Sequence, residues 1–93
     1  MFSGGENEMT RTALLIRVDG STCEITPKRK KFKLEELQAL VHGYIERVRL
    51  ADGSDMVVNE EGLLLDLPLN CYASSLARTV ICGDVVVLRR GLW

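Results

Sequence analysis

Residues 32–62 read FKLEELQALVHGYIERVRLADGSDMVVNEEG and predict one short helix followed by a hairpin of two strands. Two glutamates open the helix, where negative charge is favoured, and Gly43 follows where it would end. Four apolar side chains share one face of the expected helix at residues 34–42: Leu34, Leu37, Leu40 and Val41. So short a helix is marginal alone, so we expect this stripe to lie at the centre of the core.

After Gly43 the apolar pattern changes from helical spacing to alternation. The segment ADGS at residues 51–54 supplies a turn before a second strand at 56–58, and an Asp-Gly turn between alternating segments is a strong hairpin signal. The same alternation places Glu46 on one face with Val48. A carboxylate near the core has to be paired, and Arg47 or Arg78 could supply the partner.

The flanking sequence predicts further elements on each side of this unit. Residues 13–26 read as a hairpin about Asp19-Gly20-Ser21, which Pro27 ends. The run LLLDLPLN at residues 63–70 suits a buried, irregular crossing, and Asn70 can cap a short helix at residues 71–77. The apolar run at residues 85–88 predicts a strand at the centre of the sheet.

This order of elements, ββαββ(α)β, predicts an α+β domain with the β-grasp (ubiquitin-like) fold. In that plan the last strand pairs with the first in parallel, and one main helix covers one face of a small mixed sheet. A small β-barrel with one helix is the alternative. We expect residues 1–10 to form a flexible arm, and residues 11–93 a single globular domain with one modest core.

Composition excludes several classes of function. A formal net charge of -1 predicts no general attraction to nucleic acid or membranes, and no apolar run approaches the ~18 residues of a membrane span. The N-terminus lacks the pattern of a signal peptide. Three cysteines without close pairing favour a reducing compartment. We therefore expect a cytoplasmic protein, or one that acts inside a host cell if the gene is viral.

The chain resembles a small domain of unknown function found in proteins of bacteriophages, plasmids and large DNA viruses. The likeness covers residues 24–88 and is carried by the segments LEELQ, GYIE, VRL, MVVNEEG, LPLN and GDVVVL. Such domains often place Ser or Thr before LEEL, where this chain has Lys33. The resemblance implies a viral or mobile-element source and a small accessory role, without an established activity or any functional residue.

The residues suited to catalysis or metal binding are not spaced for either. Cys23, His42, Cys71 and Cys82 form no C-x2-C or H-x3-H pair, and we expect Cys23 and Cys82 to be small apolar residues within strands. The sequence also lacks a recognisable nucleophile–base pair or phosphate loop. We therefore predict a protein that is not an enzyme and that has no metal site or cofactor.

The strongest local charge feature is the tract KRKKFK at residues 28–33. It could contact phosphates, and Phe32 could stack on a base, so a nucleic-acid-binding accessory protein is the alternative function. A solvated loop with Phe32 packed beneath the helix is the simpler interpretation, because nucleic-acid-binding proteins usually carry a basic excess. The basic residues are Lys28, Arg29, Lys30, Lys31 and Lys33.

The first hypothesis is a non-enzymatic protein-interaction module that binds a host or viral protein. Its contacts would lie on a sheet edge or on a sheet face without a helix. Asn59, Glu60 and Glu61 follow the expected strand at residues 56–58 and are the candidate protein-binding residues, since we expect them to be exposed in a turn. Turn chemistry alone would also explain them. The sequence leaves the oligomeric state open.

Overall fold

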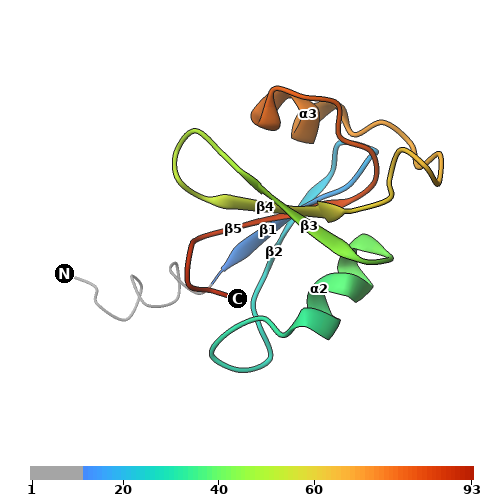
Figure 1. The fold of residues 1–93 in the computed structure, drawn as a ribbon. Helices are drawn as coiled ribbons and strands as arrows, with labels where there is room; N and C mark the ends of the chain where they lie inside the picture. Colours follow the sequence, from blue (N-terminus) through green and yellow to red (C-terminus); the bar gives the residue numbers. More distant parts are fainter. Residues whose placement is uncertain (1–11) are drawn as a thin grey trace.

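A computed structural model describes residues 12–93 as a five-stranded antiparallel sheet with one helix on each side (Figure 1). The expected arm at residues 1–10 lies outside the described residues. In chain order the elements are β1 (Ala13–Ile16), β2 (Thr22–Ile25), α2 (Leu34–Val41), β3 (Ile45–Arg49), β4 (Asp55–Asn59), α3 (Cys71–Ala77) and β5 (Val85–Leu88).

Both predicted hairpins are present. Ile16 pairs with Thr22 in the first, and Arg49 pairs with Asp55 in the second. Gly20 and Gly53 have φ angles of 90° and 89°, which glycine adopts without the strain that a side chain would add. In the second hairpin, the Arg49 Nε donates to the Asp55 Oδ1 at 2.7 Å.

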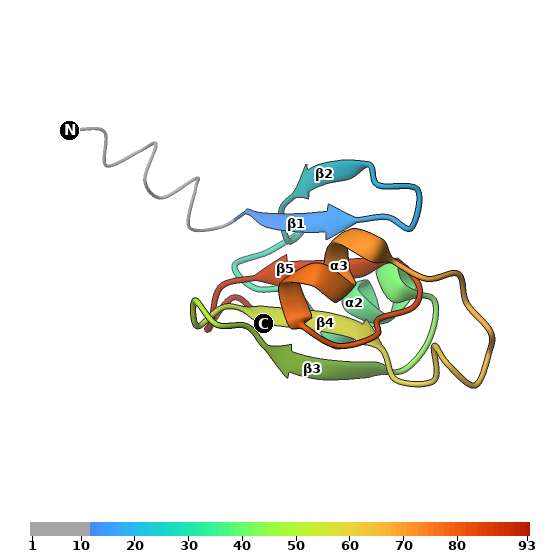
Figure 2. The same ribbon diagram turned by 90° about the horizontal axis from the view of Figure 1, so that it is seen from above.

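The sheet order is β2-β1-β5-β4-β3, which confirms the predicted central position of β5 (Figure 2). The predicted parallel pairing of the first and last strands is wrong, because Ile16 pairs with Val85 in an antiparallel ladder. The cause is that β5 starts near the end of β1, where the Asn70 side chain binds the carbonyl oxygens of both Ile16 and Gly83. The barrel alternative is wrong too, since the sheet is open.

The α2 face of the sheet holds one of two buried cores. Leu37 and Val41 are fully buried there, Phe32 and Leu92 are nearly so, and Leu40 packs at the margin. Leu34 is half exposed, so its predicted place in the core is wrong. Lys33 offers no hydroxyl cap, and the Glu36 carboxylate accepts a hydrogen bond from the Lys33 amide instead, at 3.0 Å.

The α3 face holds a second core, of which α3 itself supplies only small side chains. Ala73 is fully buried against a cluster that includes Met56, Ile81 and Val85. Asn70 caps α3 as predicted, because its Oδ1 accepts from the Ala73 amide at 3.0 Å. A helix therefore lies over each sheet face, and the expected helix-free face does not exist.

Candidate functional site

An exposed apolar surface lies where the chain leaves β4, at residues 60–69, which we call the β4–α3 loop. In both ribbon views this loop projects beyond the end of the sheet (Figures 1 and 2). Leu63 and Leu64 are 67% and 84% exposed, and Val80, which lies across from them, is 59% exposed. Burial of LLLDLPLN was predicted, and for these leucines that prediction is wrong.

A hollow of about 440 Å³ lies beside this loop on the α3 face, and we call it the β4 groove. Its apolar wall comes from Val48, Leu63, Leu64 and Val80, and its carboxylates are Glu46 and Glu60. A second hollow of about 420 Å³ lies on the other side of the loop and is lined by residues that include Tyr44, Glu61 and Leu65. The loop thus presents apolar side chains and acidic groups to both hollows.

Backbone contacts hold the β4–α3 loop in shape. The Leu65 amide donates to the Glu61 carbonyl, and the Leu67 amide donates to the Gly62 carbonyl. A Cβ at Gly62 would lie 2.8 Å from the Cys82 carbonyl oxygen, so only glycine allows this close approach. The exposed leucines are therefore presented by a folded turn, a preorganisation that lowers the entropic cost of binding.

The charges that line both hollows are acidic. Glu46 and Glu60 line the β4 groove and Glu61 lines the second hollow, whereas neither lining includes a lysine or arginine from residues 12–93. Glu46 is exposed, so the expectation of a carboxylate near the core is wrong. The arginine–carboxylate pair of this hairpin is Arg49–Asp55. Glu46 is free to face a ligand in the groove.

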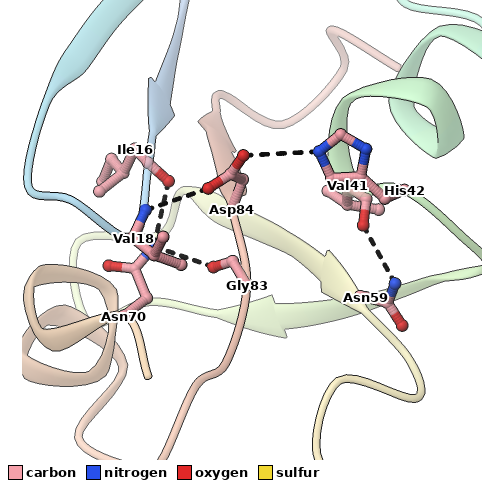
Figure 3. Close-up of polar contacts among 8 residues, drawn as sticks. All are labelled: Ile16, Val18, Val41, His42, Asn59, Asn70, Gly83 and Asp84. Atoms are coloured by element: carbon pink, nitrogen blue, oxygen red, sulfur yellow. Dashed lines mark hydrogen bonds and ion pairs between the residues drawn. The ribbon is translucent and has the colours of Figure 1, made fainter. Parts of the chain in front are cut away.

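Asn59 differs from its two acidic neighbours in being buried. It is 5% exposed, and its Nδ2 donates to the Val41 carbonyl at 3.0 Å (Figure 3). Its Oδ1 accepts from the Glu61 amide at 2.8 Å. Its predicted exposure is therefore wrong, although Glu60 and Glu61 are exposed as expected. Asn59 fixes the end of α2 and the start of the loop, and its part in binding would be to position Glu60 and Glu61.

A second polar cluster joins β1, β5 and the end of α2. The Asn70 Nδ2 donates to Ile16 and Gly83, and the Asp84 carboxylate accepts from the Val18 amide at 3.0 Å (Figure 3). The other Asp84 oxygen lies 3.5 Å from the His42 Nε2. The polar groups of Asn70 and Asp84 have partners within the fold, so the cluster holds these elements together, and His42 is its exposed member.

The basic tract folds as a loop against the core. Phe32 is buried, so stacking of its ring on a base is excluded, and its amide donates to the Leu92 carbonyl at 2.7 Å. The Glu36 carboxylate accepts from the amides of Lys33 and Lys28. These hydrogen bonds lower the pKa of Glu36, with the one from Lys33 having the largest effect. The five basic residues of the tract are all exposed.

The thiols are dispersed over the molecule. Cys23 and Cys71 are exposed and Cys82 is partly buried. Cys23 lies within β2 as expected but is not buried, and the expectation that Cys82 lies within a strand is wrong, because it lies between α3 and β5. Within residues 12–93 the structure gathers no group of three or more potential metal ligands. Over the same residues, no helix is long and apolar enough to cross a bilayer.

The family described as Domain of unknown function (DUF3846) matches residues 9–91. The chain belongs to the DUF3846 family. No curated protein matches the chain, and no solved structure does so. The predicted likeness to a small domain of unknown function is thereby confirmed at family level. The exposure of Leu63, Leu64 and Val80 in this DUF3846 domain was not predicted from the sequence, although Asp66 and Pro68 interrupt the apolar run that contains the two leucines.

Proposed function

We propose that this DUF3846 domain is a non-enzymatic protein-interaction module whose partner docks in the β4 groove. The observation that carries the proposal is the exposure of Leu63, Leu64 and Val80 around one hollow. Large contiguous apolar surface in water is unfavourable, and on soluble proteins it commonly marks a binding site. The hydrogen-bonded loop also supports the proposal. Because the loop is already ordered, binding does not have to pay the entropic cost of ordering it.

Charge complementarity supports one kind of partner. With Glu46 and Glu60 lining the groove, the matching surface carries apolar side chains flanked by lysine or arginine. The sequence motifs resemble those of bacteriophage, plasmid and large-DNA-virus proteins, so the partner is proposed to be a host or viral protein. The apolar contacts supply most of the affinity, and the carboxylates favour a basic partner over an acidic one.

Differential capture from host lysate tests this function. We expect the unmodified domain to retain a protein that the variant Leu63→Ser/Leu64→Ser loses, because two apolar contacts are replaced by hydroxyls. The matched control is Leu34→Ser, which changes a half-exposed leucine on α2 away from the groove. Equal retention by all three forms, or retention of no protein by any of them, would contradict the proposal.

Nucleic-acid binding through residues 28–33 is the second candidate. The observation in its favour is that the Phe32–Leu92 hydrogen bond holds the basic tract beside the C-terminal segment, which also carries the exposed Arg89 and Arg90. The fold therefore joins two basic segments that are distant in the sequence. Phosphate contacts from such a surface would be strongly salt-dependent.

A fluorescein-labelled single-stranded DNA provides the test by fluorescence anisotropy. Glutamine at Lys28, Arg29, Lys30 and Lys31 should weaken binding and flatten its salt dependence, whereas Arg17→Gln/Arg78→Gln, away from the tract, should not. Binding without salt dependence, or equal losses in both variants, would reject this candidate.

A further inference from the structure

The β3 strand is an edge of the sheet within residues 12–93, so one side of its backbone is not paired with another strand. On its other side, the Tyr44 carbonyl accepts from the Glu60 amide and the Leu50 amide donates to Ser54. Because antiparallel strands alternate between hydrogen-bonded and non-hydrogen-bonded pairs, Glu46 and Val48 also point their backbone groups at β4. The intervening residues Ile45, Arg47 and Arg49 present their N–H and C=O groups to the free edge.

The side chains of β3 point alternately to the two faces of the sheet. Glu46 and Val48 line the β4 groove on the α3 face. Ile45 packs on the α2 core, so Arg47 shares that opposite side. A strand added to this edge would therefore place every second side chain beside Glu46 and Val48, next to the groove, and the others beside Ile45 and Arg47.

Charge argues against a second copy of the chain at this edge. A two-fold antiparallel pairing that matches the free backbone groups sets Arg47 opposite Arg47 of the second copy. Shifting the register either way sets Glu46 opposite Glu46, or Arg47 opposite Arg49. Like charges directly opposite each other are destabilising, so each of these registers is disfavoured.

We propose that β3 takes up an extended, antiparallel segment of the partner protein with the pattern apolar–acidic–basic–apolar, by β-strand addition. These four positions lie opposite Val48, Arg47, Glu46 and Ile45 in that order, so each charge meets its opposite and each apolar residue meets an apolar one. The basic side chain lies beside Glu46 at the groove wall. This proposal rests on the proposed protein-interaction function and specifies the partner segment that would bind beside the β4 groove.

Two labelled peptides test the charge pattern by fluorescence anisotropy. The probe is Gly-Thr-Val-Glu-Lys-Val-Thr-Gly, and the control exchanges its charges to give Gly-Thr-Val-Lys-Glu-Val-Thr-Gly. We expect the probe to bind about tenfold more tightly, because the exchange turns two attractive cross-strand pairs into repulsive ones. Equal affinities, or no binding of the probe at millimolar concentration, would overturn the inference.

N-methylation of the probe tests the backbone contacts without altering the protein. The glutamate amide faces β3 and the lysine amide faces away, so methylation at glutamate should abolish binding and methylation at lysine should spare it. Equal effects of the two methyl groups would exclude strand addition.

The variant Arg47→Pro provides the matching test on the protein. It removes the outward amide without removing a β3–β4 hydrogen bond, and edge strands tolerate proline with this orientation. We expect it to lose the probe, whereas Arg47→Ala should keep backbone-dependent binding. If Arg47→Pro retains the captured partner and Leu63→Ser/Leu64→Ser loses it, the groove function stands and strand addition falls. If the peptides behave as expected but Leu63→Ser/Leu64→Ser retains the captured proteins, the groove function falls.

Discussion

The two faces of the sheet are covered in different ways. On one face, α2 buries Leu37 and Val41 completely, and the C-terminal segment closes the margin with Leu92. On the other face, α3 buries Ala73, and the β4 groove lies open beside β3. On this second face the groove lies between β3, the β4–α3 loop and residues 79–82, outside the core that α3 covers.

This difference separates stability from recognition within one small domain. The α2 core holds the strands in place with side chains that no ligand can reach. The other face is held by its own buried core, which includes Met56, Ile81 and Val85, and by the hydrogen bonds of Asn70. The exposed leucines of the β4–α3 loop lie outside that core, so they can vary with little effect on the fold. Mutations on the two faces should therefore have different consequences.

The largest expected effect is that of Leu37→Ala. The side chain is fully buried in the α2 core, so its truncation removes apolar contacts and leaves a cavity. We expect the free energy of unfolding to fall by about 2–5 kcal/mol. Urea denaturation followed by circular dichroism measures the change, and a loss below about 0.5 kcal/mol would show that the two faces are not different in this way.

Asn70→Ala should have the next largest effect. It removes the acceptor for the Ala73 amide and the donor to the Ile16 and Gly83 carbonyls, which would stay buried without this partner. We expect a loss of about 1–3 kcal/mol. Thermal unfolding is the measurement. The control is Ser75→Ala, a substitution at an exposed position of the same helix. If Asn70→Ala were as stable as that control, the hydrogen bonds of Asn70 would not stabilise the fold.

Leu64→Ser should scarcely alter stability. The side chain is largely exposed, and surface substitutions usually change the free energy of unfolding by no more than about 0.5 kcal/mol. The same urea titration as for Leu37 gives the comparison. A loss above 1 kcal/mol would mean that the β4–α3 loop is packed in solution and that the groove is not open.

The smallest expected effect concerns the acid side of the stability curve. Because the folded-state pKa of Glu36 is lowered, the ionised carboxylate stabilises the fold above its unfolded-state pKa. That stabilisation is lost as the pH falls through the folded-state pKa. Glu36→Gln should therefore lower the melting temperature at neutral pH and flatten its decline in acid. If the melting temperatures of the two proteins fell in parallel between neutral pH and pH 3, this prediction would be contradicted.

The sequence predicted the elements whose contacts are local. The two Asp-Gly turns, the cap at Asn70 and the end of α2 near Gly43 depend on neighbouring residues, and the structure confirms them. The antiparallel pairing of β1 with β5 depends on contacts such as Asn70 to Ile16, 54 residues apart, which no local pattern encodes.

The candidate site was predicted only in part. Glu60 and Glu61 were identified from the turn that contains them, but burial of Asn59 follows from its contact with Val41, on a separate element. Leu63 and Leu64 were expected inside because apolar composition alone does not distinguish a core from an exposed turn. The requirement for glycine at position 62 follows from its close approach to the Cys82 carbonyl oxygen, which only the three-dimensional structure shows.

The central position of β5 also governs the order in which the protein can fold. Of the strands within residues 12–93, β5 is made last during synthesis, yet it is the one that joins the β1–β2 hairpin to the β3–β4 hairpin. Until residues 85–88 emerge, the nascent chain holds two hairpins with unpaired inner edges. Such edges favour aggregation, and non-local pairing is slow. Insertion of β5 is thus the step at which the two halves become one cooperative unit.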